Sequence, residues 1–510
     1  MQTSSQNNME LANKREDSLD NRAKSVAGAQ EIAGEIWEPK ATEEKRSSFI
    51  VCYHYHILLL ATLAGGSVSF GPCPAGLSVE GQRALGCFIF CATLWVTNVI
   101  PLHITSIFAL TLLPLLNVFS ANETFALFGN KAIFFIIGAF ILSSVLVESG
   151  LSTRITCYVL GRFTTTAKGL RSMILFFCAF SSLWMSEHAV AAICFPIVLK
   201  IVASLRLYPG KSRFGTSFFF ALAWGCIAGG IATYLGGARN LLAAGMLFAE
   251  TGIQISFVSW AAAALPLAAF VLLCAFLVLE WRYPPEPVDI KAAREVLREE
   301  RKKIGPLSRR EIAICSIILL TIGMWVFLGN IIDLSVTALL SVGSMFVFRL
   351  TNWRKIEKGV NWGIILMYGG AIVMGSALHK TGASLWLINC LFENRPLSPL
   401  MIVFVLGTFS LLATEVMSNA AVVTVMLPVG LTLGRKFGVP LEIITLAIAL
   451  PSGLTFTMPI GTPANAIIYS SGYPKMRDFL SNGPLLSAFS LIMLILIAHF
   501  IWPLLGLRLG

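Results

Sequence analysis

The sequence predicts an all-α polytopic membrane protein with about 11 transmembrane helices plus two re-entrant hairpins, built as an inverted-topology repeat. Of its 510 residues, 56% are hydrophobic and only 13% are charged. Apolar stretches long enough to cross a bilayer recur along the chain, and polar-tipped segments occur twice at one fixed offset. This much apolar surface exceeds what one soluble core can bury, so the chain belongs in a bilayer.

Composition divides the chain into five parts. Residues 1–48 are polar and carry both charge signs without an apolar h-region, which predicts a disordered cytosolic tail and not a signal peptide. Residues 49–83 hold the first transmembrane segment, and residues 84–281 form the first transmembrane repeat. Residues 282–310 are a cytosolic linker with a mixed-charge helix, and residues 311–510 form the second, inverted repeat.

Basic residues in short loops predict the orientation. Nine Lys and Arg residues lie in the linker, whereas the predicted outer loops 119–129 and 249–256 contain none. This distribution places the N-terminus in the cytoplasm. The net charge of +11 therefore reflects topology and does not indicate nucleic-acid binding. The predicted location is the plasma membrane.

The internal repeat is visible in polar breaks within apolar stretches. Ser186 in WMSEHAVAAICFPI and Ser418 in VMSNAAVVTVMLPV are 232 positions apart. The same offset joins Gly150 to Gly382, while GGARN and GTPAN recur at an offset of 225. Duplicated halves with interrupted hydrophobic segments are typical of secondary transporters whose binding site lies between the repeats.

The two hairpin tips are the first candidate site. Ser186, Glu187 and His188 form one tip and Ser418, Asn419 and Ala420 the other, each between apolar arms of about 15 residues. A helix that starts after a tip directs free N–H groups toward an anion. Hydroxyl and carbonyl oxygens at the same turn suit a small hard cation.

The second break of each half follows the same logic. Gly236 and Gly461 permit close approach of the backbone, and the amides of Asn240 and Asn465 can bind a cation. The alternative interpretation is a packing kink in each helix.

Charged residues inside apolar stretches are functional candidates because burying a charge in a membrane is costly. Arg239 can attract an anion, or it can form a salt bridge with Glu187 or cap a carbonyl. His188 can face an anion or take part in proton coupling, and a neutral hydrogen-bonded histidine is the other interpretation. For Glu415 a structural hydrogen bond across the second hairpin is the preferred interpretation.

Enzyme chemistry is not expected, and no catalytic residue is predicted. The chain contains no G-x-x-x-x-G-K-[ST] or HExxH motif, and its eleven cysteines include no CxxC pair. The sequence therefore predicts no cofactor and no metal beyond a transported Na+. The coupling ion would be Na+ or H+.

Several segments resemble the divalent anion:sodium symporter family, which contains the sodium-coupled sulfate, dicarboxylate and citrate carriers. TEVMSNAAVVTVMLPVGL resembles the family's TExxSNTATxxxxLP block, GTPANAIIYSSG resembles its TPPNA element, and WMSEHAVAAICFPI occupies the first-half position. The resemblance covers about residues 56–508. It implies sodium-coupled transport of a small divalent anion (sulfate or di/tricarboxylates) by alternating access, in a homodimer embedded in the lipid bilayer.

By this resemblance, residues at both tips and both breaks hold the substrate and the cation. The substrate-binding set is Ser186, Glu187, His188, Arg239, Ser418, Asn419, Ala420, Thr462 and Pro463. The cation-binding set is Ser186, Glu187, Gly236, Asn240, Ser418, Asn419, Gly461 and Asn465.

The sequence departs from the family pattern at three of these positions. Glu187 replaces an uncharged amide, His188 replaces a hydroxyl, and Ala420 lacks the threonine hydroxyl. The carboxylate of Glu187 keeps a proton-coupled anion symporter open as an alternative. An anion exchanger is a further alternative. An anion receptor or a channel without coupled flux is the contrasting class.

Overall fold

The computed structural model describes residues 40–163, 165–329, 331–392 and 397–508, and within these residues it contains helices and no strand. The predicted all-α fold is confirmed. Residues 1–39 of the predicted tail lie outside the described residues. The last part of the predicted tail, from Lys40 on, belongs to helix α2. This is consistent with the Lys, Ala and Glu residues there, which are good helix formers.

Among the described residues, eleven helices lie up to the end of the first predicted repeat, one lies in the linker, and the rest follow. The first group is α2 (Lys40–Phe70), α3 (Val79–Thr97), α4 (Leu102–Leu115), α5 (Ala121–Phe128), α6 (Lys131–Glu148), α7 (Leu151–Phe163), α8 (Ala167–Ser181), α9 (Glu187–Ser204), α10 (Arg213–Gly230), α11 (Ala238–Thr251) and α12 (Phe257–Arg282). The linker helix is α13 (Ile290–Ile304), where a mixed-charge helix was expected.

The second group is α14 (Arg309–Phe327), α15 (Leu334–Val347), α16 (Trp353–Gly359), α17 (Trp362–Lys380), α18 (Ala383–Phe392), α19 (Pro399–Ala413), α20 (Asn419–Phe437), α21 (Leu441–Ala449), the short 3₁₀ helix η1 (Pro451–Gly453), α22 (Pro463–Ser470), α23 (Met476–Phe500) and the 3₁₀ helix η2 (Trp502–Leu505).

Helix boundaries follow the same offset as the sequence motifs. α8 and α19 start 232 positions apart, at Ala167 and Pro399, and α9 and α20 repeat this offset. Gly150 and Gly382 end α6 and α17 in the left-handed backbone region, with φ of +77° and +74°, which glycine adopts without strain. The halves therefore share local backbone structure, while the inverted orientation and the domain limits stay predictions.

Seven helices among the described residues are long and apolar enough to cross a membrane, and four further apolar helices or helical segments are shorter. The predicted total of about 11 crossings stays a prediction. The first hairpin arms, α8 and α19, have the expected 15 residues. The second arms are longer than predicted, at 18 residues in α9 and 19 in α20, because both helices continue past an internal proline.

The first tip is positioned by α10, whose residues after Arg213 are all buried. A helix that is apolar all round belongs in the interior of a bundle. A Cβ at Gly225 would collide with the carbonyl of Leu175 on α8, and a Cβ at Gly229 with that of Ala179. The two glycines thus let α10 and α8 lie backbone to backbone, as small residues do in membrane helix pairs.

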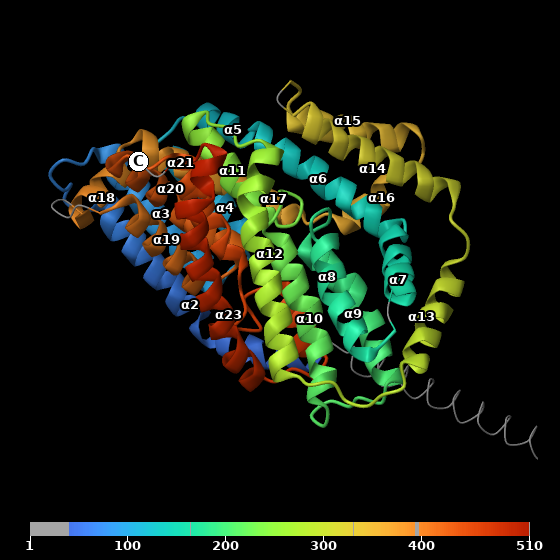
Figure 1. Ribbon diagram of the computed structural model, residues 1–510. Coiled ribbons are helices and arrows are strands. Elements are labelled where there is room, and N and C mark those ends of the chain that lie inside the picture. The colour runs from blue at the N-terminus through green and yellow to red at the C-terminus, as the bar shows by residue number, and fades with distance from the viewer. Residues whose placement is uncertain (1–39, 164, 330, 393–396, 509–510) are drawn as a thin grey trace, which may run out of the picture.

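Helices of the two halves also pack across each other. α22 of the second half contacts α9, and α11 of the first half contacts α20. Each helix that follows a break therefore lies against the hairpin helix of the other half. In Figure 1 the helices α18 to α20 lie on one side of the molecule with α2 and α3, and the linker helix α13 lies on the opposite side.

Candidate functional site

The first tip is tied to the first break by its backbone. The chain turns after α8, and α9 begins at Glu187, whose N–H donates to the carbonyl of Gly236 at 2.9 Å. The Ser186 side chain makes no capping hydrogen bond to α9. The N-terminus of α9 is thus held by the loop between α10 and α11.

Glu187 and Arg239 form a buried bidentate ion pair. Arg239 Nη1 and Nη2 donate to Glu187 Oε1 and Oε2 at 2.8 and 3.2 Å, and the two side chains are 0% and 2% exposed. Glycines provide the space: a Cβ at Gly230 would collide with the Glu187 carboxylate, and a Cβ at Gly237 would lie 2.7 Å from Arg239 Nη1. A Cβ at Gly453, in η1, would collide with the guanidinium.

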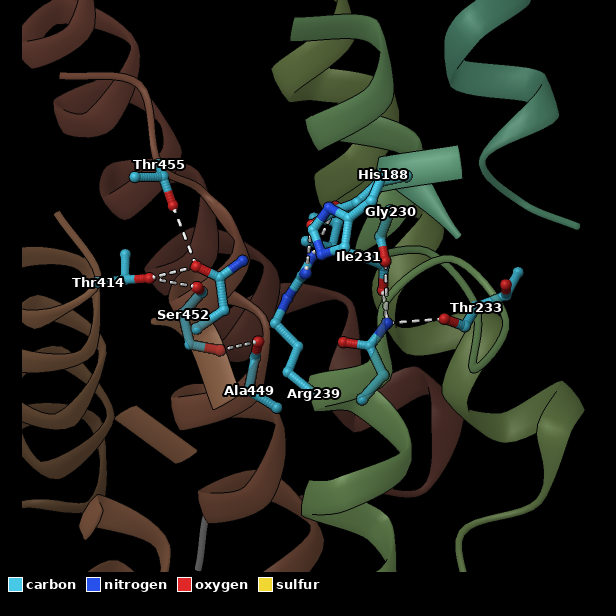
Figure 2. A network of polar contacts seen from close by, with 12 residues as sticks. His188, Gly230, Ile231, Thr233, Arg239, Thr414, Ala449, Ser452 and Thr455 are labelled. Atoms are coloured by element: carbon cyan, nitrogen blue, oxygen red, sulfur yellow. Dashed lines mark hydrogen bonds and ion pairs between the residues drawn. The ribbon is translucent and has the colours of Figure 1, made fainter. Parts of the chain in front are cut away.

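This pair bears out one interpretation of Arg239, the salt bridge to Glu187, and attraction of an anion stays a prediction. The Arg239 guanidinium is a salt-bridge partner of Glu187, and it reaches from the first half to the backbone of the second. Figure 2 shows Arg239 between the polar groups around Thr233 and those around Thr414. Geometry of this kind uses the planar fork of arginine, which lysine does not have.

The first break is closed by the amide of Asn240. Its Nδ2 donates to the carbonyls of Gly230 at 2.9 Å and Thr233 at 2.7 Å. The Thr233 hydroxyl donates to the carbonyl of Leu183 in the first tip at 2.6 Å. Asn240 Oδ1 is buried, and no described residue donates to it.

The second break has the same arrangement. Asn465 Nδ2 donates to the carbonyls of Thr455 at 2.9 Å and Met458 at 3.3 Å, which lie ten and seven residues before it, the spacing found for Asn240. Asn465 Oδ1 and Thr462 Oγ1 are buried without a hydrogen-bond partner among the described residues. Pro463 is exposed and starts α22.

At the second tip, oxygen atoms surround the amide of Asn419. One terminal amide atom lies 2.8 Å from Thr414 Oγ1, 3.1 Å from the Gly461 carbonyl and 3.2 Å from the Ser452 carbonyl. The Thr414 hydroxyl itself donates to that Ser452 carbonyl at 2.6 Å. Two arrangements satisfy these oxygens: the amide nitrogen donates to them, or the amide oxygen joins them around a hard cation.

The two tips differ in their serines. The Ser418 hydroxyl accepts a hydrogen bond from the backbone at the start of α20 and is a regular N-cap, whereas Ser186 is not. Ser418 is exposed and Ala420 is half-buried. The His188 side chain is 36% exposed, and its Nδ1 lies 3.8 Å from Glu187 Oε1.

Glu415 binds the second break, which differs from the predicted bond across its own hairpin. Its carboxylate accepts hydrogen bonds from the backbone N–H groups of Phe456, Thr457 and Met458 at 2.8 to 3.2 Å. Glu415 is 8% exposed, so these bonds replace its hydration. Its role is structural, as predicted, but the loop after η1 is what it holds.

The structure thus joins several predicted site residues pairwise: Glu187 to Arg239 and Gly236, and Asn419 to Gly461. It adds Thr414, Ser452 and Gly453, which the sequence analysis missed. Thr414 was detectable, because it directly precedes Glu415 in the TEVMSN segment. Whether the predicted residues bind substrate or cation stays a prediction.

Comparisons with known proteins agree with this architecture. The family model described as the sodium:sulfate symporter transmembrane region matches residues 53–508 of this chain. A sodium-dependent dicarboxylate transporter of Staphylococcus saprophyticus is 25% identical over 84% of this chain and 88% of its own length. The transporter of the same name from Staphylococcus aureus is also 25% identical, over the same shares.

Two solved structures share the fold. The Alcanivorax borkumensis YdaH transporter superposes with a TM-score of 0.53 and 13% identity, over 91% of this chain and 99% of its own. MtrF of Neisseria gonorrhoeae, described as one of a class of antimetabolite efflux pumps, gives the same TM-score and identity over 88% and 94%. At this identity they show the fold alone.

The family match covers nearly the whole chain, and the helical fold with paired polar tips agrees with it. The resemblance inferred from the TEVMSN and GTPAN segments is therefore confirmed. The chain belongs to the sodium:sulfate symporter family and is a multi-pass membrane transporter that couples an anionic substrate to sodium.

Proposed function

We propose that this transporter moves dicarboxylates by alternating access and holds the anion between the two tips. The relatives named sodium-dependent dicarboxylate transporters support this substrate class, since they match most of both chains. The proposal places the protein in the plasma membrane as a homodimer, with a cytoplasmic N-terminus. Catalysis has no place in this function, which moves solutes without changing them.

The observation that carries the proposal is the second tip. The oxygens of Thr414, Ser452 and Gly461 converge on the Asn419 amide at the first residue of α20. The first N–H groups of a helix have no intrahelical partner and favour an anion. A cation among the oxygens would add positive charge at the same place. One turn can therefore bind both ligands and make each depend on the other.

Uptake into proteoliposomes tests this function. Labelled succinate and labelled sulfate are offered with an inward sodium gradient, with a potassium gradient of equal strength as the control. We expect sodium-driven uptake of succinate that unlabelled dicarboxylates inhibit. The Asn419→Ala variant, expressed and monodisperse, should lose at least tenfold in sodium-driven uptake, because it removes the amide on which the oxygens converge.

The other outcomes identify the alternatives. Uptake that needs internal anion and no cation gradient would make the protein an exchanger. Uptake driven by a proton gradient alone would make it a proton-coupled symporter. Sulfate uptake that exceeds succinate uptake would overturn the substrate class and leave the sodium coupling intact.

A further inference from the structure

We propose that Arg239 is a built-in cation at the first tip, and that the carrier therefore couples its transport to sodium through the second tip alone. This inference rests on the proposed function, because it concerns how many sodium ions accompany each anion. It goes beyond that function by assigning different roles to two halves that share one backbone.

The repeat offsets identify which residues correspond. Glu187 corresponds to Asn419 at the offset of 232, and Arg239 corresponds to Ala464 at the offset of 225. The second half thus has a neutral amide and a methyl group where the first half has a carboxylate and a guanidinium. The backbone around both positions is equivalent, since Asn240 and Asn465 bind the carbonyls ten and seven residues before them.

The residues around the ion pair of the first tip also differ from their counterparts at the second tip. Thr455, whose hydroxyl lies 3.4 Å from the same terminal amide atom of Asn419, corresponds to Gly230 at the offset of 225. A side chain at Gly230 would collide with the Glu187 carboxylate. The first tip therefore has one hydroxyl oxygen fewer than the second, and the Glu187 carboxylate fills the space where that side chain would lie. Oxygens are what sodium requires, so this exchange favours the arginine over a bound ion.

Both oxygens of Glu187 are already engaged. Each accepts an N–H group of Arg239, and neither side chain is more than 2% exposed. A sodium ion at this tip would have to displace the guanidinium or lie beside a like charge in a site with little water, where repulsion is strong. The pair also leaves no net charge at the first tip, whereas an amide with a bound ion would be positive.

Contact with the second half confines the Arg239 guanidinium. The guanidinium lies against the backbone of Gly453, where any side chain would collide with it. Because Gly453 follows Ser452, whose carbonyl belongs to the oxygen cluster of the second tip, the tethered cation and the candidate sodium site lie on neighbouring backbone. A dianion held between the tips would meet a fixed, neutral ion pair on one side and an exchangeable cation on the other.

The double variant Glu187→Asn with Arg239→Ala tests the inference, because it gives the first half the residues of the second. We expect it to gain a sodium site. The ratio of labelled sodium to labelled anion taken up should rise by about one ion per anion, and the Hill coefficient for sodium should rise from about 1 toward 2. The matched control Arg171→Ala with Glu280→Asn neutralises another ion pair of the first half, outside both tips, and should leave the wild-type ratio unchanged.

A binding measurement keeps the test valid if the double variant does not fold. Sodium titrations of the melting temperature, with potassium as the control, report ion binding in detergent without transport. We expect wild type to show a saturable sodium-dependent shift and Asn419→Ala to show none, because the second tip holds the single site. A saturable shift that persists in Asn419→Ala would overturn the inference, as would an unchanged ion ratio in a folded, active double variant.

The two proposals fail in different ways. Absence of sodium-driven uptake by wild type would contradict the proposed function, and the melting titration would still report where sodium binds. Sodium-driven uptake with two sodium sites in wild type would support the function and overturn the role of Arg239.

Discussion

The first tip is closed by two opposite charges, whereas the second is closed by neutral oxygens around an amide. The backbone around the two tips is the same. Each tip follows the first arm of its hairpin, and each half has a break whose asparagine donates hydrogen bonds to two backbone carbonyls. The asparagine bonds hold the turn and are shared. The tip side chains differ, and the difference teaches that a duplicated scaffold can keep its geometry while each copy acquires its own electrostatics.

The largest effect is expected when the ion pair of the first tip is broken. Arg239→Ala leaves the Glu187 carboxylate buried without its partner, and loss of one member of a buried pair costs about 3–5 kcal/mol. Unfolding in detergent, followed by the loss of monodisperse protein on heating, measures this. The double variant Glu187→Asn with Arg239→Ala is the control and should recover most of the lost stability. If Arg239→Ala is as stable as wild type, the pair does not hold the tip.

A smaller effect is expected at Glu415, whose carboxylate binds the loop after η1. Glu415→Gln retains one oxygen acceptor but loses the negative charge, and its amide nitrogen would face the backbone N–H donors of Phe456 to Met458. Hydrogen bonds to charged groups contribute about 1.5–3 kcal/mol, so we expect a loss of about 2 kcal/mol.

The matched change in the first half is Thr233→Val. It removes the hydrogen bond that the Thr233 hydroxyl donates to the Leu183 carbonyl and a longer one, at 3.3 Å, that it accepts from the Gly236 N–H. Both bonds are neutral, and their loss should cost about 1 kcal/mol. Melting temperatures of both variants, compared in one detergent, check the order. An equal loss in both would mean that the Glu415 charge adds nothing to the link between tip and break.

Much of this comparison was predictable from the sequence. The tips and breaks interrupt apolar stretches with serine, glycine and asparagine, and a polar break inside a membrane segment is conspicuous. The fixed offset then indicated that Glu187 and Asn419 correspond. The fold class followed from composition and from the lengths of the apolar stretches.

The sequence named Glu187 as one of several possible partners of Arg239 and could not choose among them, because the choice depends on packing. Glu187 and Arg239 are 52 residues apart, and they meet where Gly230 and Gly237 leave room for both side chains. Ser452 escaped notice for a similar reason. A single serine in an apolar stretch has no periodic signal, and its carbonyl reaches Thr414 only after the chain turns through η1.

The smallest expected difference in stability between the halves concerns Asn240 and Asn465, and it gives their sharpest comparison. Each alanine variant loses two hydrogen bonds to backbone carbonyls, so both should lose similar stability, about 1–2 kcal/mol. Each asparagine also has a buried Oδ1 without a hydrogen-bond partner among the described residues. If sodium binds at the second tip alone, Asn465→Ala should raise the half-saturating sodium concentration several-fold, and Asn240→Ala should leave it unchanged. Sodium activation curves of uptake measure this difference. Equal shifts in both variants would place sodium at both tips and would remove the electrostatic distinction between them.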